Sequence, residues 1–306
     1  MGHILIAGGS GLIGSRLAVL LQEKGYETAI LSRKSPSSGG NTYHWDPGHG
    51  IIDPEAIRRA DAVINLVGAG IADTWWTPAR KRVLIESRTR PTELLIQMLE
   101  STQNEVKTFI SGSAIGIYGN TGDSLLGEEA PPGGDFMGKC ILAWETAFQK
   151  AEVLPLRTVA LRMGIVLTPA GGALSKFLLP FRFRVGAYLG NGRQWYSWIH
   201  MDDVCAIFIH ALENAEIKGK YNAVAPQPVT NKEMVTTIAR VLGGPHLIAP
   251  VPAFLLRAGM GEMADAILNS NRVSSRKIEA SGFSFRFPAL EPALKDLLIP
   301  SAKTSH

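Results

Sequence analysis

A glycine-rich turn between two apolar runs constrains the fold of this chain more than any other feature. An apolar run at residues 4–7 leads into Gly8-Gly9-Ser10-Gly11-Leu12-Ile13-Gly14, and a second apolar run at residues 28–31 ends at Ser32-Arg33-Lys34. This order predicts a strand, a tight turn, a helix beginning near Gly11 and a second strand, the first unit of a dinucleotide-binding fold. Glycine lets backbone N–H groups approach a pyrophosphate, and the positive end of the helix faces it. We therefore expect the residues from Gly8 to Gly14 to contact a dinucleotide.

The tip of the second predicted strand indicates which dinucleotide is bound. NAD sites usually carry Asp or Glu about 20 residues after the turn, where the side chain accepts hydrogen bonds from the ribose hydroxyls. This chain has Ser32, Arg33 and Lys34 there instead. Arg33 can pair with a 2′-phosphate and Ser32 can donate to it, whereas a carboxylate would repel it. The sequence therefore predicts NADP(H), the alternative being that Arg33 and Lys34 only solvate a loop.

Composition sets broad limits on what the protein is. The chain has 306 residues, 45% hydrophobic and 19% charged, which is ordinary for a globular protein long enough to form two domains. Its formal net charge is +4 and its basic residues are scattered, which argues against a nucleic-acid partner. No apolar run is long enough to span a membrane. Cys140 and Cys205 have no metal-ligand spacing, so we expect no metal and a reducing, cytoplasmic location.

The alternation of strand and helix patterns predicts an α/β fold with a doubly wound parallel sheet. Strands are expected at residues 62–67, 106–110 and 156–161, and helices at 78–90, 91–100, 138–150, 204–215 and 292–298, with a further regular element at 231–242. Pro91 is expected to kink the helix in which it lies or to begin another one. Residues 282–288 alternate aromatic and polar and are expected to form a short strand. We predict a nucleotide-binding domain at 1–165, to which 198–215 return, and a smaller α/β substrate domain at 166–306.

Several motifs resemble those of the extended short-chain dehydrogenase/reductases, and the resemblance covers nearly the whole chain. They include Gly8-x-x-Gly11-x-x-Gly14, the strand-end segment from Ser111 to Gly119, and Trp198-Ile199-His200 followed by two aspartates. More narrowly, the chain is similar to the branch called epimerase family proteins, which carry a C-terminal domain of unknown function. The residues shared with that branch are Trp45-Asp46, residues 61–66, Ser87-Arg88, residues 132–136, Trp144-Glu145, residues 178–182 and the aromatic motif at 282–290.

The resemblance implies additional cofactor-binding positions. It assigns Ser32 and Arg33 to the adenosine phosphate, the backbone of Leu66 and Val67 to the cofactor, Arg88 to a contact from its helix, and Val166 to the nicotinamide end. Ser111, which opens the strand-end segment, is counted with these residues.

The resemblance fails at the catalytic pair of the family. Extended members use Tyr-x-x-x-Lys, in which the tyrosine is the acid/base and the lysine lowers its pKa. Anchoring on Trp144-Glu145 places Met137 and Ile141 at those positions, and Lys139 is out of register. Because neither Met137 nor Ile141 can carry a proton, any chemistry needs other groups.

Two residues are the candidates for that chemistry. Ser113 can bond a substrate oxygen, or it can simply form a turn. Tyr118 can supply a proton, or it can pack beneath the cofactor. His200 is interpreted mainly as a structural histidine. Arginines of the second domain, among them Arg193, can bind a substrate phosphate or carboxylate.

Two functions remain open from the sequence. The first is an NADP(H)-dependent oxidoreductase or epimerase-like enzyme that acts on an unidentified small carbonyl or hydroxyl substrate, with Ser113 and Tyr118 as catalytic residues. The second is a non-catalytic NADP(H)-binding protein that senses redox state and acts through a protein partner. The sequence leans to the enzyme and also leaves a homo-dimer open.

Overall fold

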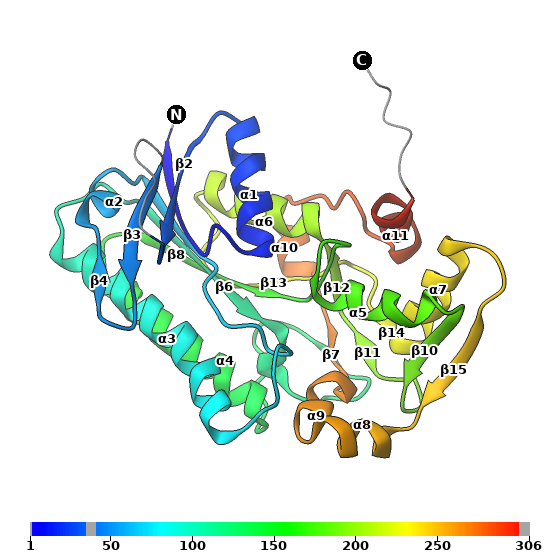
Figure 1. The fold of residues 1–306 in the computed structure, drawn as a ribbon. Helices are drawn as coiled ribbons and strands as arrows, with labels where there is room; N and C mark the ends of the chain where they lie inside the picture. The colour runs from blue at the N-terminus through cyan, green and yellow to red at the C-terminus, as the bar shows by residue number, and fades with distance from the viewer. Residues whose placement is uncertain (1, 35–40, 300–306) are drawn as a thin grey trace. The chain divides into compact units, whose positions relative to one another are not determined.

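The computed structural model describes residues 2–34 and 41–299 (Figure 1). The chain divides into two compact units. The first comprises Met1–Ile117, Gly138–Arg162 and Cys205–Tyr221, and the second comprises Tyr118–Met137, Met163–Val204 and Asn222–His306. The chain therefore passes between the units several times, and the boundary expected at residue 165 stays a prediction.

The first unit is built on an eight-stranded sheet, as the alternating pattern predicts. The strands between β2 and β6 in the sheet pair in parallel, so their carboxyl ends lie together: Ala7 pairs with Leu31 and with Asn65, and Asn65 pairs with Ser111. This shared edge is where the glycine turn begins. In spatial order the strands are β13 (Gly219–Ala223), β8 (Arg157–Met163), β6 (Thr108–Ala114), β5 (Ala62–Asn65), β1 (His3–Ala7), β2 (Glu27–Ser32), β3 (Thr42–Asp46) and β4 (Ile51–Ile52).

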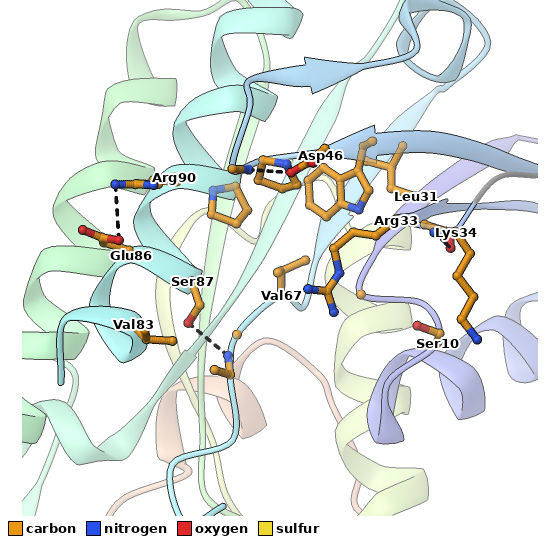
Figure 2. Close-up of a pocket in the computed structure, with 18 of the residues that line it drawn as sticks. Ser10, Leu31, Arg33, Lys34, Asp46, Val67, Val83, Glu86, Ser87 and Arg90 are labelled. Atoms are coloured by element: carbon orange, nitrogen blue, oxygen red, sulfur yellow. Dashed lines mark hydrogen bonds and ion pairs between the residues drawn. The ribbon is translucent and has the colours of Figure 1, made fainter. Parts of the chain in front are cut away.

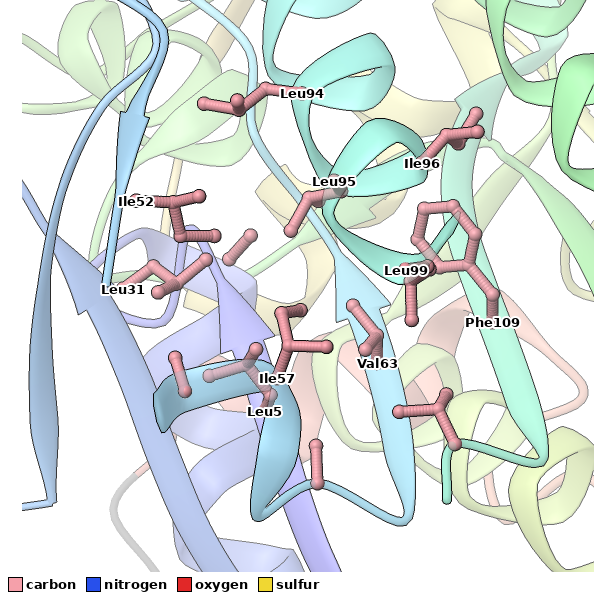
Figure 3. Packing of buried hydrophobic residues seen from close by; sticks show 14 of the residues in the cluster. Leu5, Leu31, Ile52, Ile57, Val63, Leu94, Leu95, Ile96, Leu99 and Phe109 are labelled. Carbon is pink, nitrogen blue, oxygen red and sulfur yellow. The ribbon is translucent and has the colours of Figure 1, made fainter. Parts of the chain in front are cut away.

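Helices cover both faces of this sheet, which confirms the predicted α/β class. Figure 1 shows α3 (Pro78–Ser101) and α4 (Phe136–Gln149) on one face and α1 (Leu12–Glu23) and α6 (Met201–Glu213) on the other. The short helix α2 (Pro54–Arg58) packs on the face of α3, and the 3-10 turns η1 (Ile115–Tyr118) and η2 (Lys150–Val153) link longer elements. The core between the sheet and α3 is apolar and fully buried; Figure 3 shows Leu5, Val63, Leu95 and Phe109 in it.

Pro91 does not begin a new helix, so that part of the prediction is wrong. Helix α3 is continuous from Pro78 to Ser101, with Pro91 inside it. The hydroxyl of Thr92 donates to the backbone oxygen of Arg88 at 2.7 Å, which adds a bond one position beyond the proline. Leu94, Leu95 and Leu99 bury the following turns, and such packing outweighs the local cost of a proline.

The second unit is built from short strand pairs and helices around a separate apolar core. The strand pairs are β9 (Ile165–Leu167) with β12 (Trp198–His200), β10 (Val185–Leu189) with β15 (Leu247–Val251), β11 (Trp195–Tyr196) with β14 (Val229–Thr230), and β7 (Leu125–Leu126) with β16 (Arg272–Val273). The helices are α5 (Gly172–Phe181), α7 (Asn231–Leu242), α8 (Ala253–Met260), α9 (Met263–Leu268), α10 (Arg276–Ala280) and α11 (Leu290–Leu298). No helix in the described ranges is both long and apolar enough to cross a bilayer.

Residues 282–288 form no strand, which corrects a second expectation. Their backbone N–H groups bond to a side chain instead: Asp203 accepts from the backbone nitrogens of Arg286 and Phe287, each at 2.9 Å. The ring of Phe287 packs on His200, with centroids 4.0 Å apart. Phe287 is thus held against the His200 segment rather than in a sheet, and the rings of Phe283 and Phe285 contact each other.

Candidate functional site

The glycine turn has the close backbone contacts that the sequence predicts. Gly8 has φ of +82°, a conformation that favours glycine. A Cβ on Gly14 would lie 2.3 Å from the oxygen of Gly8, so only glycine lets α1 approach β1 this closely. Gly11 is the N-cap of α1, and no acidic side chain stands in the first turn of that helix. The turn therefore presents the positive end of α1 to the carboxyl edge of the sheet.

A cavity of about 760 Å³ opens beside this turn, within the first unit. Figure 2 shows Arg33 and Lys34 extending from the end of β2 over Ser10, with Ser87 and Arg90 on the opposite wall. Gly8, Ser10, Ser32, Arg33 and Val67 are the predicted cofactor residues that line it. The other lining residues are Leu31, Lys34, Trp45, Asp46, Pro47, Gly48, Gly68, Ala69, Arg80, Val83, Glu86, Ser87, Arg90 and Pro91.

The end of β2 offers unpaired positive charge. Arg33 and Lys34 are exposed, and neither makes an ion pair within the described part of the chain. The backbone nitrogen of Lys34 donates to the hydroxyl oxygen of Ser32 at 3.1 Å. The hydroxyl of Ser32 accepts in that bond, so its own proton remains available for a ligand. This edge of the cavity thus has two cations and a hydroxyl donor side by side.

The remaining charged side chains of the cavity are compensated. Asp46 lies 2.7 Å from His49, whose hydrogen bond holds the pKa of Asp46 below its usual value. Glu86 pairs with Arg90 at 3.2 Å, and Arg80 lies 3.7 Å from a carboxylate of the preceding loop. Free positive charge therefore concentrates at Arg33 and Lys34.

The backbone after β5 forms another wall of the cavity. A Cβ on Gly8 would lie 2.9 Å from the carbonyl carbon of Leu66, so the two predicted backbone segments touch. The nitrogen of Val67 donates to the side-chain oxygen of Asn65 at 3.2 Å, and the amide of Asn65 donates to Thr92 at 2.9 Å. This buried chain of bonds fixes the position of Leu66 and Val67.

Arg88 lies behind this wall and does not line the cavity. Arg88 is 7% exposed, and its guanidinium donates to the backbone oxygens of Leu84 and Ala69 at 2.8 and 3.0 Å. The hydroxyl of Ser87 accepts from the backbone nitrogen of Ala69 at 3.1 Å, so Ser87 and Arg88 together bond both backbone polar groups of Ala69. Burial lowers the pKa of Arg88. In this structure Arg88 supports the loop, and its direct contact with a cofactor stays a prediction.

The hydroxyl of Ser113 is committed to a buried ionic network. Ser113 is 1% exposed and donates to Glu145 at 2.7 Å. Arg162 donates to both oxygens of Glu145, at 2.7 and 2.8 Å, and Lys220 lies 3.5 Å away. Burial raises the pKa of Glu145, but the bonds and charge of Arg162, with Ser113 and Lys220, outweigh it and hold the pKa below its usual value. Glu145 is therefore a carboxylate, and it accepts a hydrogen bond from the hydroxyl of Ser113.

The other predicted residues also have defined places. Tyr118 is 2% exposed, and its phenol donates to Asn222 at 2.7 Å within the second unit. Ser111 is buried in β6 and donates to the backbone of the next residue. Val166 is the central residue of β9 in the second unit. Met137 and Ile141 are buried apolar residues of α4.

The sequence predicted no role for residues 45–48 or for the α3 residues that line the cavity, since its one cofactor candidate on α3, Arg88, lies behind the wall. Trp45 and Asp46 belong to the motifs shared with the family, and that resemblance is the signal by which the sequence marks this wall. Which face of α3 meets the cavity depends on its packing, which no local motif reveals.

Comparison with known proteins shows the family of this chain. Residues 4–224 match the NAD dependent epimerase/dehydratase family, and residues 251–297 match a domain of unknown function, DUF1731. Since the first match spans most of the chain, this protein belongs to the NAD dependent epimerase/dehydratase family. Its second match groups it with the epimerase family proteins that carry this C-terminal domain, which confirms the family indicated by the motifs.

Relatives match over nearly their whole length. Epimerase family protein Mb2239 of Mycobacterium bovis is 37% identical, over 95% of this chain and 96% of its own. Epimerase family protein YfhF of Bacillus subtilis is 36% identical, over 97% and 98%. The structure of human epimerase family protein SDR39U1 with NADPH superposes with a TM-score of 0.87 at 32% identity, covering 96% of this chain and 98% of the human one.

Proposed function

We propose that this protein binds NADP(H) in the cavity beside the glycine turn and uses it on a small carbonyl or hydroxyl substrate. The observation that carries the cofactor proposal is the pairing of the glycine turn with the unpaired cations Arg33 and Lys34. Because Gly8 and Gly14 have no side chains, the turn packs closely against Leu66 and against its own backbone, and the start of α1 would face the pyrophosphate. The human relative was solved with NADPH, which supports the same choice. Bound NADP(H) supplies or accepts a hydride.

The chain's own residues would divide the binding between them. Ser10 and the start of α1 would face the pyrophosphate, and Ser32 with Arg33 and Lys34 would face the 2′-phosphate. The hydrogen bonds of Asn65 would hold the backbone segment after β5, at Val67, in place beneath the cofactor. Because an arginine–phosphate bond is charge-assisted, it discriminates strongly between NADP(H) and NAD(H).

Titration of the protein with NADPH and NADH, followed by fluorescence, tests the cofactor. Changing Arg33→Ala is expected to weaken NADPH binding about tenfold to a hundredfold, from the roughly 1.5–3 kcal/mol of a charge-assisted hydrogen bond, and to leave NADH binding unchanged. Arg58→Ala, an exposed arginine at the end of α2 outside the cavity, is the matched control. An equal loss for both dinucleotides in Arg33→Ala would contradict the assignment.

A second candidate, a non-catalytic NADP(H)-binding protein that acts through a protein partner, is favoured by a different observation. The hydroxyl protons of Ser113 and Tyr118 are both donated inside the protein, to Glu145 and Asn222. Met137 and Ile141 offer no proton either. The groups that would carry chemistry are thus engaged in structural bonds.

Single-turnover oxidation of bound NADPH by fractionated cell extract separates the two candidates. Loss of the NADPH signal with one fraction, abolished in Ser113→Ala or Tyr118→Phe although NADPH still binds, supports the enzyme. Tight NADPH binding with no oxidation by any fraction supports the ligand-sensing protein.

A further inference from the structure

One end of the second unit carries exposed apolar side chains that do not belong to its core. Helix α5 ends at Phe181, and the chain then turns into β10. Leu179, Phe183 and Leu247 are 54%, 80% and 69% exposed. β10 pairs in parallel with β15, and Val185 lies opposite Leu247, so the turn and the start of β15 are adjacent (Figure 1). We call the surface formed by Leu179, Arg182, Phe183, Arg184 and Leu247 the α5–β10 tip.

The backbone of the α5–β10 tip is hydrogen-bonded in an unusual conformation. Arg184 has φ of +60°, and it is the one non-glycine residue with a positive φ in the part of the chain that the structure describes. The backbone nitrogens of Arg182, Phe183 and Arg184 donate to the backbone oxygens three residues earlier, at 3.4, 2.9 and 3.0 Å. That of Leu247 donates to the backbone oxygen of Arg184 at 2.9 Å. These bonds hold the turn that exposes Phe183, and they lower the cost of moving its backbone out of water.

The α5–β10 tip has positive charge, and the segments that form it have no acidic residue. Residues 153–201 contain no Asp or Glu, and residues 234–261 contain none either. These two stretches include both strands of the β10–β15 pair. Arg182 and Arg184 are exposed, and neither makes an ion pair among the residues that the structure describes. Phe183 is therefore flanked in the sequence by two arginines whose charge is available to an anionic partner.

This combination of side chains fits the surface of an anionic membrane. Guanidinium groups bond lipid phosphates, and phenylalanine and leucine side chains enter the boundary of the acyl chains beneath them. Two copies of the chain that met at this surface would bring four arginines together, and these would repel one another. Side chains as exposed as Phe183 and Leu247 project from the protein, and a fluid lipid surface needs no matching pocket to receive them. A lipid surface is therefore favoured over a second copy or an acidic protein.

We propose that the α5–β10 tip attaches this protein to the surface of anionic membranes without spanning them. Leu179, Phe183 and Leu247 enter the acyl boundary, and Arg182 and Arg184 bond the lipid phosphates. Because three side chains bury little apolar area, this binding is weak and reversible. The proposal rests on residues of the second unit alone and goes beyond the NADP(H) proposal, whose failure would leave it unchanged.

The test is cosedimentation of the full chain with vesicles of phosphatidylcholine alone or of equal parts phosphatidylcholine and phosphatidylglycerol. Binding to the anionic vesicles is expected, and it should weaken when salt rises from about 0.1 M to about 1 M, which shortens the Debye length from about 10 to about 3 Å. Phe183→Ala is expected to weaken binding about tenfold, the lower end for burying a phenylalanine, and Phe183→Trp to retain it. Arg184→Gly keeps a residue that suits the left-handed conformation and is expected to weaken binding about fivefold.

The matched controls are Phe254→Ala and Arg276→Ala, which are expected to bind vesicles like the unaltered protein. Phe254 is 69% exposed on α8, after the opposite end of β15, and Arg276 is exposed on α10. Three outcomes would overturn the proposal: no binding to anionic vesicles, equal binding to neutral and anionic vesicles, or equal losses in Phe183→Ala and Phe254→Ala. Binding of heparin that competes with the vesicles and is unaffected by Phe183→Ala would also overturn it, and would indicate an acidic macromolecule as the partner.

Discussion

Replacing Glu145 with glutamine tests whether the Ser113 network stabilises the protein. Glu145 is 2% exposed, and it pairs through both oxygens with Arg162, which is 3% exposed. Glu145→Gln keeps the shape of the side chain but leaves a buried guanidinium without its counter-charge. Breaking a buried ion pair in this way costs about 3–5 kcal/mol. At roughly 2–4 °C per kcal/mol for a protein of this size class, Tm is expected to fall by about 6–20 °C.

The matched control is Glu93→Gln on the neighbouring helix. Glu93 pairs with Lys150 at 2.6 Å, but its side chain is 46% exposed, and exposed pairs contribute less than about 1 kcal/mol. Urea unfolding of both variants gives the comparison. If Glu145→Gln lowers the free energy of unfolding no more than Glu93→Gln does, the buried network does not stabilise the protein as proposed. The double variant Glu145→Leu/Arg162→Met removes both charges and is expected to lose less stability than Glu145→Gln.

The pH dependence of this variant gives a second check on the same reasoning. The pKa of Glu145 is held below its usual value in the folded protein. Its stabilising contribution is therefore fully present above the unfolded value of about 4.3 and is lost as the pH falls through the folded pKa. The stability gap between the unaltered protein and Glu145→Gln is expected to narrow in that acid range. If this stability difference widens as the pH falls, the folded pKa of Glu145 is not below its unfolded value and the reasoning is wrong.

Three further predictions concern the turn, Tyr118 and His200. Gly14→Ala places a Cβ 2.3 Å from a backbone oxygen, so NADPH affinity is expected to fall at least tenfold and unfolding free energy by about 1–3 kcal/mol, whereas Gly127→Ala, with open space around it, should change neither. Tyr118→Phe leaves Asn222 without its donor and is expected to cost about 1–3 kcal/mol in urea unfolding; no loss would argue against the bond. Burial lowers the pKa of His200 despite the nearby carboxylates of Asp202, Asp296 and Asp203, so its contribution is present above about pH 6.5 and lost below it. Tm is expected to drop between about pH 7.5 and 5.5, and less so in His200→Asn; an equal drop in both would refute this.

Local rules predicted the parts of the fold that depend on neighbouring residues. The glycine turn, the strand pair around it and the start of the helix at residue 78 all follow from contacts within a few positions. Thr77 accepts from the backbone nitrogen of Arg80 at 3.1 Å, as a threonine before a first-turn proline predicts. The helix over Asn231–Leu242 begins with a capping box at Thr230 and Glu233 and has the predicted bounds.

The errors arise where contacts between residues that are distant in the sequence decide the local structure. The strand expected at 282–288 is replaced by bonds to Asp203, more than 80 positions away in the sequence. Helix α3 continues through Pro91 because its turns are buried, and helix propensity, which depends on the local sequence, contains no information about that burial. In the same way, Ser113 and Glu145 meet only after β6 and α4 have packed together.

The direction of the Ser113 bond limits what the enzyme candidate can do. Because Glu145 is a carboxylate, the hydroxyl of Ser113 donates to it and has only lone pairs left for anything else. A serine in that state cannot polarise a carbonyl by donating to it, but it can accept a hydrogen bond from a hydroxyl. If Ser113 meets a substrate at all, the geometry therefore favours an alcohol over a ketone or aldehyde. The proton released when that alcohol is oxidised needs an acceptor other than Ser113 and Glu145, since Arg162 and Lys220 hold Glu145 as the anion.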